Sequence, residues 1–347
     1  MKRLRPYIIL CPLLMLGCLE IETTSKVNPH GSIHRLIKMK GSAQSISDSN
    51  FNLPRLDADL WEIKQDSLRD DEQLYSAQRL FESVEALNKS FELNSKPQQV
   101  HIKANLEQNE GFFFTRHYYT ETLWAELPGP DISMETFLTA AELEALFLND
   151  SDENSGQLDS VESQRIEDQF DKFIQARIYE DFVGELRQGA RQAGVFDSVD
   201  SILNANNDSL VVQLSSTNYY DENQVWKNVL HAYLSSSVLD SIEQRNAQGF
   251  ASFYMRWAFF EEVLLDEYIL SVEMPGVIRK TSAVDVRGNR VTWEPESILV
   301  FFGGIKLEAE SSQVRIWSVV VTGVLLLLTL VVSVMSYVRQ RKLLSPI

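Results

Sequence analysis

The chain contains 347 residues, of which 44% are hydrophobic and 23% are charged, enough for one large domain or two modest ones. Asp and Glu outnumber Lys and Arg by 49 to 32, so the formal net charge is −17. Residues 1–17 and 315–347 contain seven of the bases and no acid, which leaves residues 18–314 with 25 bases against 49 acids. A segment this acidic excludes general nucleic-acid binding, because neutralising phosphates needs clustered Lys and Arg.

The N-terminal segment has the pattern of a secretory signal peptide. The chain begins with three basic residues, continues with an apolar run and reaches the small residue Gly17. This order predicts a signal peptide over residues 1–17. The ending Met15–Cys18 also resembles the lipobox of bacterial lipoproteins, a family in which the cysteine is acylated on its thiol and becomes the mature N-terminus. We expect lipidation at Cys18; the alternative is an ordinary signal peptide that contains a cysteine by chance.

The sequence has two cysteines, Cys11 and Cys18. Cleavage before Cys18 leaves one thiol, at the first residue of the mature chain. The body is therefore predicted to contain no internal disulfide, no cysteine-based metal site and no cysteine nucleophile.

A second membrane signal lies near the C-terminus. Residues 316–338 contain no charge, and a helix of this length is roughly 34 Å long, enough to span a bilayer. Trp317 and Tyr337 lie at its two ends, where aromatic rings favour the membrane interface. Basic residues follow directly, so the positive-inside rule predicts a cytoplasmic tail over residues 339–347 and an extracytoplasmic body over residues 18–314.

The first part of the body is predicted to contain a hairpin, a linker and a helix. In residues 20–40 the side chains alternate in character with a period of two on both sides of the turn cluster at residues 28–32, which is typical of a β-hairpin. Residues 41–70 are polar and poorly periodic, which indicates a linker with a short helix near Trp61. Apolar residues recur at helical spacing over residues 71–92 and predict an amphipathic helix.

Residues 98–126 change to a period of two and predict two strands. The second of these, residues 112–124, is densely aromatic. Its rings are most simply core, and the alternative is one wall of an apolar groove for an acyl chain, because both need the same residues. Helices are predicted after it, around residues 134–148, 166–186, 225–233 and 250–264.

Strands return over residues 268–311. If Cys18 is acylated and residues 316–338 span the membrane, both ends of the body lie at one membrane surface. We therefore expect residues 20–40 and 268–311 to form a single membrane-proximal sheet, and residues 71–264 to form a mainly helical body. The predicted fold class is α+β.

One stretch of this segment resembles a known family. Residues 273–278 end a strand in Pro-Gly, and residues 288–293 supply a Gly-Asn turn followed by Val-x-Trp. With the final strand and the apolar helix, this pattern resembles LppM-type envelope lipoproteins over residues 268–338, and more weakly over residues 20–40. Ser282 departs from the pattern, where Asn is more usual. The resemblance implies a membrane-anchored extracytoplasmic domain with a role in envelope lipids and no known catalytic residue.

The sequence gives little support for a metal site or a catalytic site. The acidic loop Asp150–Gly156 alternates carboxylates as an EF-hand does, but its glycine comes one place late and Val161 occupies the place of the final acid. The loop is interpreted as solvated. The histidines lack a metal-binding spacing, and no nucleophile, phosphate-loop or paired-carboxylate motif is present. The histidines are His30, His34, His101, His117 and His231.

The sequence therefore predicts a non-enzymatic protein tethered to the bacterial cytoplasmic membrane, with no catalytic residue, metal or cofactor. The leading hypothesis is an interaction or scaffold component of the cell envelope. The alternative is an envelope lipid-binding module, and a hydrolase without a recognisable motif ranks third. The expected partners are the membrane, through the helix and the acyl anchor, and an envelope lipid or protein, but no nucleic acid.

Overall fold

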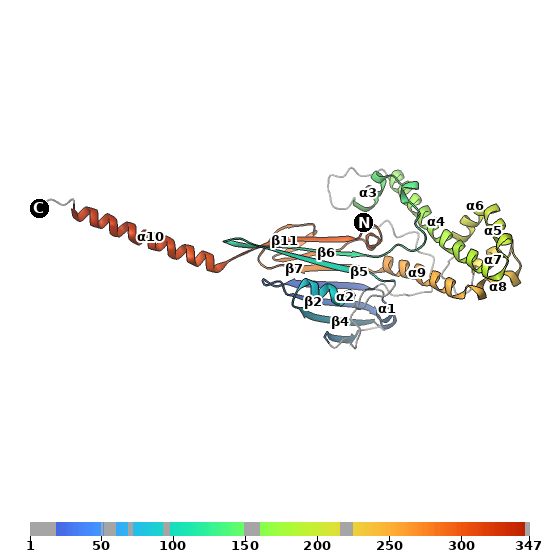
Figure 1. The fold of residues 1–347 in the computed structure, drawn as a ribbon, viewed down its shortest axis with the longest axis horizontal. Coiled ribbons are helices and arrows are strands. Elements are labelled where there is room, and N and C mark those ends of the chain that lie inside the picture. The colour runs from blue at the N-terminus through green and yellow to red at the C-terminus, as the bar shows by residue number, and fades with distance from the viewer. Residues whose placement is uncertain are drawn as a thin grey trace.

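The computed structural model of the chain describes residues 19–49, 51, 60–68, 72–92, 98–148, 160–215 and 225–343. Within these residues the fold is α+β, as expected from the sequence. Two β-sheets form an elongated sheet body, helices gather at one end of it, and a single long helix, α10 (Ile316–Leu343), leaves the other end (Figure 1).

The larger sheet has seven strands. In order across the sheet they are β3 (Glu62–Ser67), β4 (Glu72–Phe81), β2 (Ile33–Ser42), β1 (Glu20–Val27), β7 (Glu267–Glu273), β10 (Arg290–Trp293) and β9 (Asp285–Arg287). The predicted hairpin is confirmed: β1 and β2 pair antiparallel from Glu20 with Lys40 to Val27 with Ile33. Alternate residues of both strands are buried, because one face of the sheet covers the core.

The smaller sheet has four strands, in the order β5 (His101–Glu110), β6 (Phe114–Trp124), β11 (Ile305–Val314) and β8 (Val277–Thr281). The predicted strand pair at residues 98–126 is therefore confirmed as β5 and β6. Their inward side chains, including the fully buried Tyr119 and Leu123, join those of the larger sheet in one shared core. The short helix α2 (Val84–Glu92) packs on β5, where the Asn88 amide exchanges hydrogen bonds with the backbone of Ala104.

The helical lobe is built around α4. Its members are α4 (Ser160–Ala193), α5 (Phe196–Ala205), α6 (Asn207–Ser215), α7 (Val225–Leu230), α8 (Ser236–Arg245) and α9 (Ala247–Leu265). Rings from three of these helices meet at its centre: the Phe182 centroid lies 5.4 Å from that of Trp226 and 5.5 Å from that of Phe253. This cluster buries the apolar face of α4, so the mainly helical middle of the chain is confirmed.

The helix predicted over residues 71–92 is wrong for its first half. Residues 72–81 form β4, and helix begins only at Val84. Tyr75, Ala77 and Phe81 are buried, in the alternation typical of a strand. The segment forms a strand and not a helix because β4 pairs with β2 along ten residues. The Ser83 hydroxyl accepts from the Ala86 N–H and begins the helix.

Two other predicted helices differ in position. The short helix expected near Trp61 lies earlier, as α1 (Ala43–Asp48), and Trp61 directly precedes the edge strand β3. The helix expected at residues 134–148 is divided into a 3₁₀ turn, η1 (Met134–Thr136), and α3 (Ala140–Leu148). The division comes from a capping box: Thr139 and Glu142 each accept a hydrogen bond from the other's backbone N–H.

The single sheet expected from residues 20–40 and 268–311 is instead divided between the two sheets. β7, β9 and β10 join the hairpin, whereas β8 and β11 join β5 and β6. The reason is the length of β6, which offers β11 ten consecutive partners from Phe114 to Leu123. The second 3₁₀ turn, η2 (Ser297–Val300), carries the chain from one sheet to the other, and Val300 O accepts from Ala125 N beyond the end of β6.

The strand directions give the sheet body two different ends. β1 runs parallel to β7, so both begin beside the helical lobe, where Glu267 N donates to Leu19 O. β11 also runs away from the lobe, toward α10, and Pro275, just after the end of β7, lies against Ser311 of β11. Leu19, the first described residue, is therefore buried at the lobe end, and the start of α10 lies at the opposite end (Figure 1).

Candidate functional site

The apolar helix near the C-terminus is the first candidate functional element. Ile316–Tyr337 is the one span in the described part of the chain that is long and apolar enough to cross a membrane, with a mean hydropathy of 2.6. Only 6% of its most apolar stretch is buried inside the protein, so it is not a core helix of the sheet body. Sixteen large apolar side chains of this span are exposed and need a non-aqueous partner, either a bilayer or other helices.

The start of α10 is joined to the turn between β5 and β6. Arg315 N donates to Phe113 O at 2.8 Å, and the Arg315 guanidinium donates to Gly111 O at 3.0 Å. The same guanidinium forms an ion pair of 2.9 Å with Glu110. The Phe112 ring lies 5.4 Å from the Trp317 ring in an edge-to-face contact. Backbone, charge and ring contacts together fix the helix to the sheet body.

The aromatic strand 112–124 separates into two parts. Tyr119 and Leu123 face inward and belong to the core, whereas Phe112, Phe113 and Phe114 are each 42–53% exposed at the tip of the hairpin. The inward rings are therefore core rather than an open acyl-chain wall, and the outward rings lie beside α10.

A buried polar cluster lies between the two sheets. The Arg35 guanidinium on β2 makes two hydrogen bonds of 2.8 Å to the Glu121 carboxylate on β6, and both side chains are 1% exposed. Ser25 on β1 accepts from Arg35 and from the Tyr119 hydroxyl. Burial alone lowers the pKa of Arg35, but the charges of Glu121 and Tyr119 and the hydrogen bond to Glu121 together raise this pKa above its usual value. Among the described residues the buried Arg35 Nε atom has no hydrogen-bond partner, whereas the other guanidinium nitrogens bind Ser25 and Glu121, so the cluster is a structural network.

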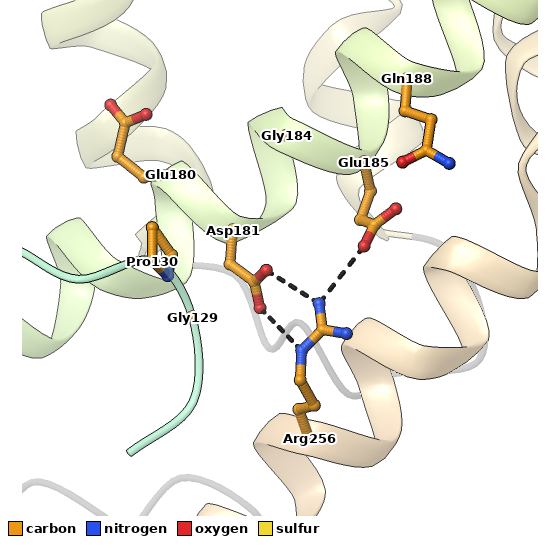
Figure 2. Close-up of a pocket in the computed structure, with 8 residues that line it drawn as sticks. All are labelled: Gly129, Pro130, Glu180, Asp181, Gly184, Glu185, Gln188 and Arg256. Atoms are coloured by element: carbon orange, nitrogen blue, oxygen red, sulfur yellow. Dashed lines mark hydrogen bonds and ion pairs between the residues drawn. The ribbon is translucent and has the colours of Figure 1, made fainter. Parts of the chain in front are cut away.

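An open polar groove lies in the helical lobe, between the loop after β6 and the helices α4 and α9 (Figure 2). Its volume is about 480 Å³, and a neighbouring hollow of about 310 Å³ shares Gly129 and Arg256 with it. The groove is lined by Gly129, Pro130, Glu180, Asp181, Gly184, Glu185, Gln188 and Arg256.

Arg256 is neutralised by two carboxylates of α4. Its guanidinium donates to Asp181 at 2.8 and 3.3 Å and to Glu185 at 3.3 Å (Figure 2). The Trp257 indole N–H also donates to Asp181, at 2.9 Å. Glu180 points away from this cluster at the rim and stays exposed, so the groove presents hydrogen-bond acceptors and a net negative charge.

One wall of the groove is held by Arg177. This guanidinium is 6% exposed and donates to the carbonyl oxygens of three successive residues, Leu127, Pro128 and Gly129, at 3.0–3.2 Å. Gly129 has a φ of +82°, and a Cβ there would lie 3.1 Å from Arg177 O and 3.2 Å from the Trp257 ring. The loop can approach α4 this closely only because residue 129 is glycine. Sequence reasoning did not identify Arg177, Arg256 or the groove.

The described residues contain no group of three or more His, Cys, Asp or Glu side chains that could hold a metal ion. Asp150–Gly156 lies outside the described residues, and Val161 lies in the first turn of α4. His101 stacks on Trp124, and burial lowers the pKa of His117, which leaves its ring neutral near pH 7. Cys18, the predicted lipidation site, also lies outside the described residues.

The comparisons with known proteins give one solved structure. No family model and no curated protein matches the chain. The NMR structure of the folded domain of Mycobacterium tuberculosis LppM is similar over 88% of this chain and 96% of that one, at 9% sequence identity and a TM-score of 0.31. At this level of similarity, neither fold nor function is transferred from that protein to this chain.

Proposed function

We propose that α10 crosses the bacterial cytoplasmic membrane once, with the sheet body and helical lobe outside the cytoplasm. The support is the exposed apolar span from Ile316 to Tyr337 and the basic residues that follow it. Residues 339–347 then form a short cytoplasmic tail. Acylation of Cys18 remains a prediction from the lipobox-like sequence.

The function that this arrangement supports best is a non-enzymatic interaction or scaffold role in the cell envelope. One observation carries it: α10 lies at one end of an elongated body, and the helices α4 and α9, which line the polar groove, lie at the other end (Figure 1). A lobe held away from the bilayer can meet partners of the envelope.

The lipid-binding alternative has less support. It needs an apolar cavity for an acyl chain, but the inward rings of β6 pack into the shared core. The groove in the helical lobe is lined largely by charged and amide side chains, which do not suit an acyl chain.

The topology is tested with a reporter enzyme that is active only outside the cytoplasm. A fusion after Ile347 should be inactive, and a fusion at Ser312, before α10, should be active. The reverse pattern would contradict the orientation, and equal activity of both fusions would contradict a spanning helix.

The binding role is tested by purifying the full chain from detergent extracts and identifying the co-purified proteins and lipids by mass spectrometry. Glu180→Arg reverses an exposed charge of the groove, and Asp197→Arg makes the same change on α5 as the matched control. A partner lost from Glu180→Arg but retained by Asp197→Arg supports the groove as its site. A protein partner supports the scaffold role, and a stoichiometric lipid supports the alternative.

A further inference from the structure

The exposed rings at the tip of the β5–β6 hairpin form a continuous apolar surface with the start of α10. We call Phe112, Phe113, Phe114 and Trp317 the aromatic tip. Their exposed fractions are 53%, 42%, 46% and 50%. Phe112 and Phe113 lie in the hairpin turn, Phe114 begins β6, and Trp317 lies in the first turn of α10. Exposed rings gathered in this way mark a surface that contacts another apolar phase.

The turn that presents these rings is tightly specified. Gly111 N donates to Phe114 O at 2.8 Å, and a Cβ on residue 111 would lie 3.1 Å from the same oxygen. β11 pairs with β6 through Val314 and Phe114, the last pair before α10. The tip therefore has a fixed position relative to the first turn of α10, and it cannot move away from that helix as a loose loop could.

The charged side chain between the sheet body and α10, Arg315, is also suited to a membrane surface. Arg315 is the one base between the sheet body and the apolar span, on the side that the positive-inside rule disfavours for basic residues. Its ion pair with Glu110 neutralises it, and its remaining donors reach Gly111 O and the Trp317 ring face. Such a compensated Arg is suited to the level of the lipid headgroups.

We propose that the aromatic tip inserts into the outer interface of the bilayer that α10 crosses, and so holds the sheet body upright on the membrane. The proposal rests on the proposed function, because it takes α10 to be in the bilayer. Aromatic side chains favour the interfacial layer, and Trp317 begins the span. Since the hydrogen bonds of Arg315 fix the tip beside Trp317, insertion of α10 brings Phe112 and Phe113 to the same depth. The bilayer is thus the occupant of this surface.

Depth is measured with the full chain in vesicles of phosphatidylethanolamine and phosphatidylglycerol. Cys11→Ser and Cys18→Ser remove both native thiols, and Phe113→Cys then carries one environment-sensitive fluorophore. Met255→Cys, at an exposed apolar position on α9 in the helical lobe, is the matched control. Lipids with a spin label near the headgroup should quench the fluorophore at residue 113 at least about twofold more than the one at residue 255.

The outcomes separate the two proposals. Equal quenching at both positions, in protein that floats with the vesicles, overturns insertion of the tip but keeps α10 in the membrane. Protein that does not float overturns the spanning helix and the tip insertion together. Strong quenching at residue 113 alone supports both.

A second measurement tests whether the tip controls orientation. Energy transfer is measured from a donor at residue 255 to acceptor lipids, in Phe112→Ser/Phe113→Ser and in the control Val284→Ser, which changes an exposed apolar residue outside the tip. The tip variant should raise the transfer efficiency, because an untethered sheet body tilts and brings the helical lobe nearer the bilayer. An efficiency equal to that of the control would overturn the role in orientation.

Discussion

The sheet body and the helical lobe are stabilised in different ways. At the centre of the sheet body a charged pair, Arg35 and Glu121, is removed from water and joins one sheet to the other. At the centre of the lobe the contacts are between aromatic rings, and the partly buried ion pair of Arg256 with α4 lies at the groove. A buried ion pair adds little net stability, but its two side chains must keep one relative position to remain paired. Aromatic rings can pack against one another in several arrangements. The ion pair therefore fixes the two sheets relative to each other, whereas the lobe can accept changes in its side chains and surface.

The largest expected effect is in the sheet body. Glu121→Ala leaves the Arg35 guanidinium buried without its carboxylate, and we expect the free energy of unfolding to fall by about 3–5 kcal/mol. Chemical denaturation of the full chain in detergent measures it. The double variant Arg35→Met/Glu121→Leu removes both charges and should recover most of the loss. A double variant as unstable as Glu121→Ala would contradict this account.

A smaller effect is expected in the helical lobe. Arg256→Met removes the partner of Asp181 and Glu185, which then repel each other at the groove, and we expect a loss of about 1–3 kcal/mol. Arg187→Met is the control, because Arg187 lies on α4 in a more exposed ion pair with Asp200 and should change stability by less than about 1 kcal/mol. Hydrogen exchange should increase only in the lobe. Increased exchange in the sheet body would show that the two regions are not independent.

The boundary between the two regions carries a pH-dependent effect. Asp266 follows α9, and burial together with the Glu262 charge raises the pKa of its carboxyl to about 8, although Leu19 N–H donates to it. Between about pH 4 and pH 8 the unfolded chain releases this proton and the folded chain keeps it, so stability falls as pH rises, by at most about 1.4 kcal/mol per pH unit. The fall ends above pH 8.

Asp266→Asn keeps the shape of the neutral acid and should remove this slope. Unfolding measured at pH 5 and pH 8 should show the variant gaining stability relative to the unsubstituted chain as pH rises. Glu267→Gln, an exposed neighbour, is the control and should leave the slope unchanged. A slope that persists in Asp266→Asn would assign the pH dependence to other groups.

The sequence predicted best where one local pattern decides the structure. The hairpin at residues 20–40 follows from alternation around a turn, and α10 follows from an uninterrupted apolar run. β4 was mistaken for a helix because its apolar residues fit both periods, and only its pairing with β2 decides between them. The division into two sheets depends on pairing across the chain, which no local pattern contains.

The sequence contained a signal from which the buried pair of Arg35 and Glu121 could have been predicted. Arg35 stands at an inward position between Ile33 and Ile37, and Glu121 stands at an inward position between Tyr119 and Leu123. A charge on the buried face of a strand requires a partner of opposite charge, so the two could have been matched. Arg177 and Arg256 gave no such signal, because their partners are carbonyl oxygens of a loop and carboxylates on another helix.

The direction of β1 changes what a second anchor would mean. β1 is an interior strand, paired on both edges, and its eight residues separate Leu19 from the α10 end of the larger sheet by about 25 Å. An acyl chain on Cys18 would be one residue from Leu19, at the end of the body remote from α10. A body that stands upright on the membrane cannot place both anchors in one leaflet unless β1 is pulled out of the sheet. A molecule anchored at both ends would therefore be a spacer that sets the gap between two lipid surfaces, and a molecule in a single bilayer would depend on α10 alone.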